Sequence, residues 1–310
     1  MITLRTLAPM GIGLLISLTS GLALAIPFTP VLDEFWIMKG AAGATPVEIF
    51  RDSFNDGILP PSGPDGASTY VMVGAGGMTS ETLGPPGKLT MTPSLGDNVL
   101  ITTTYADVAT AGLRRLATNP LNPNILDQAN SFEIHGLYDM SNLPMISGQS
   151  FGIRANDRAA DLGYLGNNTF DLFVGVFSQG PNAGKLGVFL RENDFTNNSS
   201  TVVWSDPAID SLLLGTDQIE LELSKTAGSD QINLSYYLYD YDLATPLLHS
   251  ASLNNAGTLY VAESGQTAEP FVRAQFISTD RVSIPEPATL ALLGLGFAGM
   301  TFMRKRKASA

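Results

Sequence analysis

The stretch that decides the fold runs Ile219-Glu220-Leu221-Glu222-Leu223-Ser224, with an apolar side chain at every second position. A period of two places the apolar side chains on one face of a β-strand and the carboxylates on the other, facing water. The pattern continues in residues 232–239, and Gly228-Ser229-Asp230 between the two runs is typical of a turn. Residues 219–239 are therefore predicted to form an antiparallel hairpin.

Further strand-like runs follow one another along the chain between turn-rich clusters. Residues 170–177 and 185–190 predict a second hairpin around the loop 179–184. Six other runs also predict strands: 69–74, 88–92, 98–104, 131–138, 151–155 and 271–277. Residues 105–130 are compatible with one short helix or a long crossing loop. Because no helix–strand alternation is present, the predicted fold class is all-β, an antiparallel β-sandwich.

Composition limits the function classes. With 44% hydrophobic and 15% charged residues, a chain of 310 residues can bury a sizeable core. It contains no cysteine, which excludes disulfides, thiolate metal sites and cysteine nucleophiles. Residues 26–283 hold 12 basic and 28 acidic residues, a net charge of −16, which disfavours binding to nucleic acid. The acidity fits solubility, divalent cation binding or repulsion from anionic polysaccharide.

Residues 1–25 have the pattern of a secretory signal peptide. One cation, Arg5, precedes an apolar run that ends in small residues. Ala23 and Ala25 supply the small side chains that a signal peptidase admits, so cleavage after Ala25 is predicted. A permanent N-terminal helical anchor is the alternative, but proline and glycine interrupt the apolar stretch.

The C-terminal region combines a short motif, an apolar helix and a basic cluster. The motif Pro285-Glu286-Pro287 precedes residues 288–303, which carry no charge. A helix over 288–303 would be about 24 Å long, slightly shorter than a bilayer core, and is predicted to be transmembrane. The cluster Arg304-Lys305-Arg306-Lys307 then acts as the membrane stop on the cytoplasmic side. An ordinary tail anchor is the alternative.

This tail resembles the PEP-CTERM sorting domain of Gram-negative bacteria, although Ile284 stands where Val is usual. The resemblance implies that an exosortase recognises Pro285, Glu286 and Pro287 during passage through the inner membrane. It also implies release or transfer of the protein outside the cell, at the surface or in a biofilm. The predicted domains are therefore a signal peptide (1–25), an exported β-sandwich (26–283) and a sorting tail (284–310).

A second resemblance concerns the exported domain. The residues Phe50-Arg51-Asp52-Ser53-Phe54-Asn55-Asp56-Gly57, followed by Gly87-Lys88-Leu89-Thr90-Met91, are similar to the opening of concanavalin A-like lectins and glucanases. The resemblance implies a jelly-roll-like sandwich in which one concave sheet carries carbohydrate.

No catalytic residue is predicted. Glucanases of that fold place closely spaced acids on one strand face, because acid and nucleophile must flank the scissile bond. Glu220 and Glu222 share a face, but their strand also carries core-facing Ile and Leu, so a solvated outer face explains them. The two histidines, His135 and His249, lack a serine-elbow motif and are assigned structural roles.

Two binding sites are considered. Asp52, Asn55 and Asp56 could supply oxygen ligands for calcium, the one cofactor considered, although an Asp-Gly turn explains the same residues. Tyr237, Tyr239 and Tyr241 alternate along a strand and could stack on sugar rings, although tyrosine also favours strands for packing.

The leading hypothesis is a noncatalytic cell-surface or extracellular-matrix protein that contacts extracellular polysaccharide. Its expected partners are signal peptidase and exosortase, as processing enzymes, and not nucleic acid. The alternative is a secreted carbohydrate-active enzyme of concanavalin-like fold. An enzyme needs two carboxylates converging in one cleft, whereas a binding protein needs exposed aromatic rings on a sheet face.

Overall fold

The computed structural model describes residues 28–55, 68–72, 77–81, 87–94, 97–105, 126, 129–141, 145–156, 168–194, 199–207, 209–213, 215–259 and 272–280. These residues belong to one compact unit, Phe28–Val282. The predicted signal peptide, sorting tail and membrane helix 288–303 lie outside the described residues. Among the residues that are described, no helix is long and apolar enough to span a bilayer.

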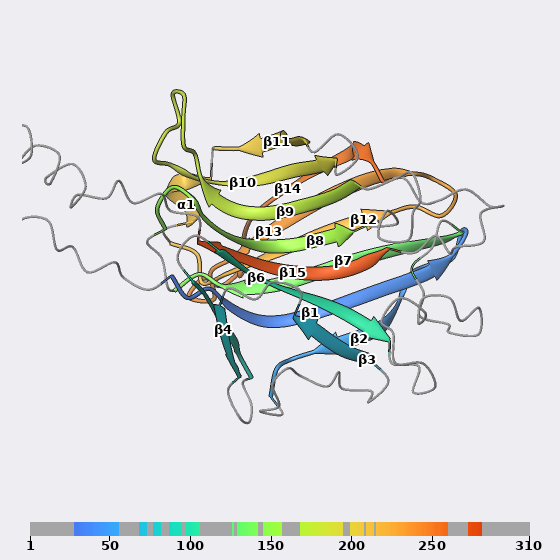
Figure 1. Cartoon of the computed structure of the whole chain (residues 1–310). Helices are drawn as coiled ribbons and strands as arrows, with labels where there is room; N and C mark the ends of the chain where they lie inside the picture. The colour runs from blue at the N-terminus through green and yellow to red at the C-terminus, as the bar shows by residue number, and fades with distance from the viewer. Residues whose placement is uncertain are drawn as a thin grey trace, which may run out of the picture. The chain divides into compact units, whose positions relative to one another are not determined.

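Two antiparallel sheets make up nearly all of the described structure (Figure 1). Sheet A has the order β14-β13-β12-β7-β1-β5-β4, and β2 also pairs with β1. Its strands are β1 (Val31–Ala41), β2 (Val47–Asp52), β4 (Gly77–Glu81), β5 (Leu89–Pro93), β7 (Asn130–Asp139), β12 (Gln218–Lys225), β13 (Gln231–Tyr239) and β14 (Leu247–Thr258). The short helix α1 (Asp210–Leu213) precedes β12.

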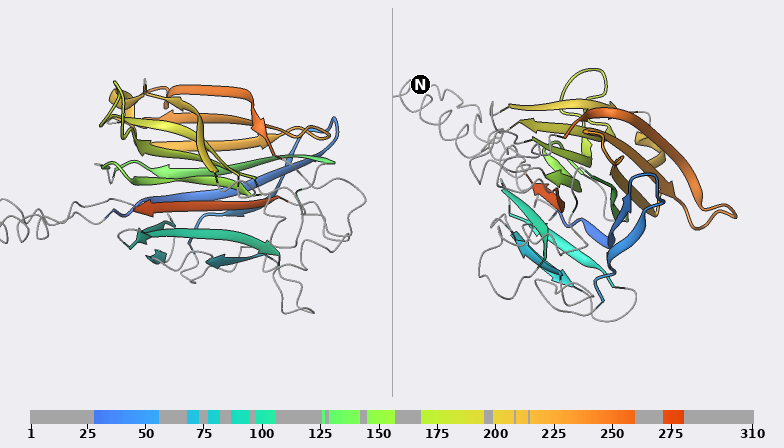
Figure 2. Two further views of the ribbon diagram at one scale, coloured as in Figure 1. Left: turned by 45° about the horizontal axis from the view of Figure 1, so that its top comes forward. Right: turned by 90° about the vertical axis from the view of Figure 1, so that its right-hand side faces the viewer.

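Sheet B has the order β11-β10-β9-β8-β15-β6-β3. Its strands are β3 (Ser68–Met72), β6 (Asp97–Tyr105), β8 (Gln149–Asn156), β9 (Asn168–Val176), β10 (Leu186–Asp194), β11 (Ser199–Asp206) and β15 (Arg273–Asp280). The strands of the two sheets run in similar directions, as the left view of Figure 2 shows. The prediction of an all-β chain with two antiparallel sheets is confirmed, whereas the jelly-roll-like character stays a prediction.

The first and last described strands both lie inside their sheets. β1 pairs with β7 along one edge and with β5 and β2 along the other. β15 lies between β8 and β6. Pairing of these strands therefore joins sequence segments far apart in the chain, which makes sheet formation depend on long-range contacts.

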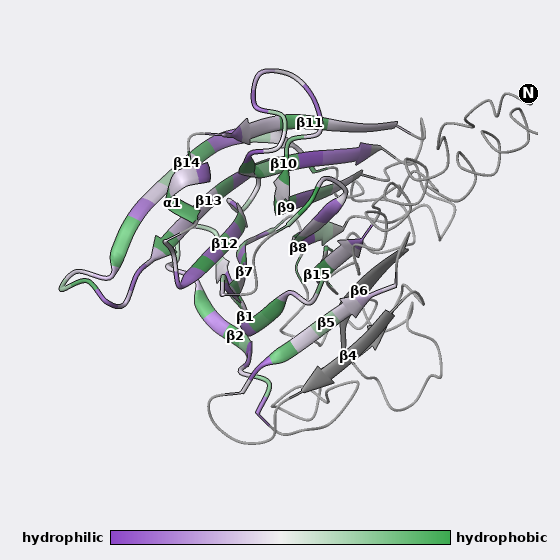
Figure 3. Ribbon diagram, turned by 90° about the vertical axis from the view of Figure 1, so that its left-hand side faces the viewer, coloured by the Kyte–Doolittle hydropathy of each residue, from purple (hydrophilic) through white to green (hydrophobic). Residues whose placement is uncertain are grey.

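The core lies between the two sheets and follows the predicted alternation. Ile219, Leu221 and Leu223 of β12 are fully buried, while the residues between them are half-buried, and β12 and β13 carry alternating bands in Figure 3. The rings of Phe35 on β1 and Phe276 on β15 pack with centroids 5.1 Å apart.

The hairpins predicted at 219–239 and 170–190 are confirmed as β12–β13 and β9–β10. The six other predicted runs correspond to β3, β5, β6, β7, β8 and β15, with shifted ends. Five strands were not predicted: β1, β2, β4, β11 and β14. Their residues do not alternate cleanly; in β11, for example, Val202 and Val203 are adjacent and both exposed. For residues 105–130 the prediction was either one short helix or a long crossing loop. Most of this segment, residues 106–125, lies outside the described residues.

A β-bulge interrupts the pairing of β1 with β7. Leu32 pairs with Tyr138 and Glu34 with Leu137, so Asp33 is the extra residue on β1. Leu32 and Phe35 are both fully buried in the core. The bulge therefore leaves two successive acids, Asp33 and Glu34, outside the core on the same strand, which strict alternation would not allow.

Candidate functional site

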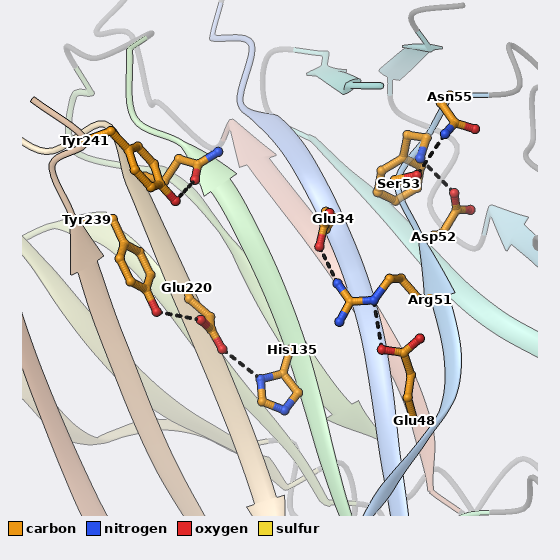
Figure 4. Close-up of polar contacts among 12 residues, drawn as sticks. Glu34, Glu48, Arg51, Asp52, Ser53, Asn55, His135, Glu220, Tyr239 and Tyr241 are labelled. Atoms are coloured by element: carbon orange, nitrogen blue, oxygen red, sulfur yellow. Dashed lines mark hydrogen bonds and ion pairs between the residues drawn. The ribbon is translucent and has the colours of Figure 1, made fainter. Parts of the chain in front are cut away.

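The outer face of sheet A, the face that points away from sheet B, carries a polar and aromatic cluster. The pairing register places Arg51, Trp36, His135 and Glu222 side by side across β2, β1, β7 and β12. These four side chains point outward because successive residues of a strand point to opposite faces, and the residues next to them face the core. Figure 4 shows Arg51 and His135 of this cluster with their polar contacts.

Trp36 is stacked between two neighbouring side chains. Its ring lies 4.6 Å from the ring of His135, with an interplanar angle of 7°. The Arg51 guanidinium lies 4.6 Å from the Trp36 ring centroid, close enough for a cation–π contact. Arg51 is itself held by ion pairs to Glu34 and, at 2.8 Å, to Glu48 (Figure 4). These contacts fix the orientation of the Trp36 ring on the face.

His135 lies between carboxylates from two strands. Its Nδ1 is 3.0 Å from Glu220 Oε1, and its Nε2 is 3.4 Å from Glu133 Oε2. Burial by itself would lower the pKa of His135, but the hydrogen bonds to Glu133 and Glu220 and the charge of Glu222 outweigh it and raise the pKa. The imidazolium therefore neutralises part of an acidic cluster.

The predicted tyrosine row lies next to these acids. The Tyr239 hydroxyl donates to Glu220 Oε2 at 3.0 Å (Figure 4), and the Tyr237 hydroxyl donates to Glu222 Oε2 at 3.4 Å. The rings of Tyr239 and Tyr241 are stacked, with centroids 6.1 Å apart and an interplanar angle of 8°. Tyr241 is 55% exposed, so its ring is accessible at the rim of the face. The structure brings all three predicted tyrosines to this face.

Glu220 and Glu222 lie on the outer face, as their pattern predicts, but water does not surround them. The side chain of Glu220 is 16% exposed, and burial raises the pKa of Glu222 above the ordinary value. The difference from a solvated face arises because large neighbours on β7 and β13 cover the carboxylates. His135 and the tyrosine hydroxyls supply the hydrogen bonds that replace water.

A pocket of about 450 Å³ opens at one end of the same face. Its lining comes from β1, β7, β12 and the segments after β2 and before β5: Asp33, Glu34, Ser53, Asn55, Gly87, Lys88, Leu137 and Gln218. A second pocket of about 480 Å³ lies at the other end of these strands, where Glu133, Ser224 and Asn233 contribute. Leu137 and Glu133 are four positions apart on β7, or about 13 Å along the strand.

The residues proposed for calcium form a local turn. Asp52 is buried, and its Oδ1 accepts a hydrogen bond from the backbone N–H of Phe54 at 2.8 Å. Asn55 is exposed and donates to Ser53 Oγ at 3.0 Å, while Asp56 lies outside the described residues (Figure 4). Within the described ranges, no group of three or more His, Cys, Asp or Glu side chains could hold a metal ion. Calcium at this turn stays a prediction.

Several residues of the cluster and of the pocket beside it were not predicted as site residues from the sequence. Trp36, Arg51 and Asp33 come from strands whose pattern the bulge and the β1–β2 pairing obscure. His135 was assigned a structural role, and His249, whose Nε2 is 3.2 Å from the Tyr236 hydroxyl, lies in a separate contact. In residues 131–138 the outward side chains fall on the odd-numbered positions. This alternation was the one signal that could have placed His135 on the same face as the acids of β12.

Comparison with protein families identifies one motif. Residues 283–307 match the PEP-CTERM protein-sorting motif, which confirms the identification of the tail. No curated protein matches the chain, and the resemblance of residues 50–57 and 87–91 to concanavalin A-like proteins stays a prediction. The match covers the end of the chain and implies export to the envelope or surface of a Gram-negative cell, with an exosortase as the enzyme that recognises the tail.

Proposed function

We propose that the exported sandwich is a noncatalytic polysaccharide-binding module and that the outer face of sheet A is its binding surface. The observation that carries this proposal is the combination, on one face, of oriented aromatic rings, fixed carboxylates and a pocket. Sugar rings present apolar C–H faces and many hydroxyls, so their binding sites combine aromatic side chains with a few well-placed polar groups. Tyr239 and Tyr241 are the rings available here, whereas His135 and Arg51 already pack on the ring of Trp36. The acids of β12 are the acceptors.

The hydrogen bonding of the acids supports a binding role over a catalytic one. Both oxygens of Glu220 are engaged, one by His135 and the other by Tyr239. Glu222 also accepts a hydrogen bond, from Tyr237. A glycosidase needs its acid and its base or nucleophile directed at the substrate, whereas these two carboxylates are held by side chains within the sheet.

Binding is tested by retention on immobilised neutral, amine-bearing and uronic-acid polysaccharides. Replacing Tyr239 and Tyr241 by Ala should weaken binding by about tenfold or more, because both stacking rings are lost. Val203→Ala, at an exposed position on sheet B, is the matched control and should bind like the unmodified protein. If the double tyrosine variant keeps a normal β-type circular dichroism spectrum and is retained as well as the unmodified protein, the proposal that this face binds polysaccharide is wrong.

Glycoside hydrolysis is a second candidate function, and one observation favours it. Glu220 and Glu222 are two positions apart on β12, or about 6.8 Å along the strand, a separation within the range of glycosidase pairs. Burial also raises the pKa of Glu222, as a general acid requires. Release of reducing sugar by the purified protein, abolished by Glu222→Gln but not by Glu48→Gln, would establish this second function in place of the first.

A further inference from the structure

We propose that the pocket at Asp33 binds a protonated sugar amine, so that the glycan held by sheet A is an amino-sugar polymer with free amino groups. This inference rests on the proposed function, because it names the ligand class for the same face. It concerns the 450 Å³ pocket lined by Asp33, Glu34, Lys88 and Gln218.

The bulge of β1 and two hydrogen bonds orient Asp33. Gln218 Nε2 donates to Asp33 Oδ2, and Gln218 Oε1 accepts a hydrogen bond from the Tyr241 hydroxyl at 2.7 Å. The Gln218 amide is thereby fixed between the tyrosine and the acid. The other carboxylate oxygen, Asp33 Oδ1, accepts no hydrogen bond from any residue that the structure describes, although Asp33 is only 8% exposed. A buried acceptor without a hydrogen bond is costly and marks where a donor on a ligand would be favourable.

Each cation that the described residues place beside the pocket pairs with a carboxylate other than Asp33. Lys88 Nζ donates to Asp139 Oδ2 and forms a longer ion pair with Asp33 Oδ1, at 3.5 Å, which is beyond good hydrogen-bond distance. Arg51 pairs with Glu34 and Glu48. The described lining of the pocket therefore holds two carboxylates, those of Asp33 and Glu34, and one cation, Lys88, which leaves an excess of negative charge.

The charge excess selects among sugars. A uronic acid would add another carboxylate to this pocket and would be repelled. A sugar ammonium offers three N–H donors and a positive charge, which suits an acceptor that burial keeps from water. Burial raises the pKa of Asp33 against the opposing effects of Gln218 and Lys88, so a cationic ligand would also stabilise the charged form. The exposed ring of Tyr241 at the pocket rim adds a surface for a cation–π contact.

The test compares three soluble probes by isothermal titration of the full chain at pH 6: oligomers of glucosamine, of N-acetylglucosamine and of a uronic acid. We expect the glucosamine oligomers to bind most tightly, since acetylation removes the charge. Asp33→Asn keeps the shape of the side chain but not its charge. It should reduce glucosamine binding about tenfold or more, with N-acetylglucosamine binding unchanged. Glu48→Gln, outside the pocket lining, is the control, and Glu34→Gln is the second variant if Asp33→Asn does not fold.

The outcomes separate this inference from the proposed function. Equal binding of acetylated and free-amine oligomers, or tightest binding of the uronic acid, would overturn amine recognition while leaving a polysaccharide-binding face. Binding of none of the three probes, nor of any immobilised polysaccharide, would overturn both. A preference for glucosamine that Asp33→Asn leaves intact would place amine recognition elsewhere and so also contradict the assignment of this pocket.

Discussion

The surroundings of His135 link the stability of sheet A to pH. The imidazole contacts carboxylates of Glu133 and Glu220 and stacks on Trp36. Its folded-state pKa is raised above the ordinary value near 6.5. Its contribution to stability is therefore fully present below about pH 6.5 and is lost as the pH rises through the folded-state pKa. The folded-state pKa of Glu222 is also raised. Its contribution to stability is therefore likewise lost as the pH rises above the ordinary carboxyl value of about 4.3.

We predict that His135→Gln destabilises the protein more at low pH than at high pH. At pH 5.5 the variant loses charge-assisted hydrogen bonds and leaves the carboxylates of Glu133, Glu220 and Glu222 without a cation. The expected loss in the free energy of unfolding is about 1.5–3 kcal/mol. The imidazole of the unmodified protein loses its charge as the pH rises through its raised pKa, so the difference should be smaller at pH 9. Urea denaturation at both pH values measures it, and an equal loss at the two values would contradict the assigned role.

At the scale of elements, a close approach of backbones joins β8 to its neighbours. A Cβ added at Gly152 would lie 2.1 Å from the carbonyl oxygen of Leu172 and 2.6 Å from Phe173 Cα, both on β9. The Gly152 carbonyl in turn accepts a 2.6 Å hydrogen bond from the buried Tyr138 hydroxyl of β7, which connects the two sheets. Glycine is therefore required where β8, β9 and β7 meet.

Gly152→Ala should lower the free energy of unfolding by about 1–3 kcal/mol, because backbone atoms of β9 must move to admit the methyl group. Gly215→Ala is the matched control, since the nearest atom to its added Cβ is 3.9 Å away. Thermal or chemical denaturation of the two variants provides the comparison. If Gly152→Ala is as stable as Gly215→Ala, the close approach does not exist in solution.

At the scale of the whole molecule, the sorting motif at residues 283–307 and the acidic described unit serve different tasks. The motif directs the chain to an exosortase, whereas the unit Phe28–Val282 holds the sheets and the proposed binding face.

Processing should therefore shorten the chain at both ends. Mass spectrometry of protein from the producing cells should find Ile26 as the first residue and an end near Pro285-Glu286-Pro287. Replacing Glu286 by Ala should leave an unprocessed precursor in the inner membrane, because the motif that the exosortase recognises is lost. Mature protein that retains Arg304 to Lys307 in cells with an active exosortase would contradict this prediction.

The sequence by itself determined the strands with clean alternation and the identity of the tail. In β12 and β13 each side chain's face follows from its position, because a strand has a strict period of two. Tyr237, Tyr239 and the two glutamates of the site could therefore be assigned to faces in advance, whereas Tyr241, predicted on the same strand, lies in the turn after β13. The tail was identifiable because its motif, apolar run and basic cluster are contiguous in sequence.

Only the tertiary structure decided which residues meet on the outer face of sheet A. β1 and β12 are nearly two hundred residues apart in sequence, and β7 lies between them in the sheet, so no local pattern relates Trp36 or Asp33 to Glu220. The bulge at Asp33 also breaks the alternation on which sequence reasoning depends. The partial burial of Glu220 and Glu222 arises in the same way, because it is set by side chains on neighbouring strands.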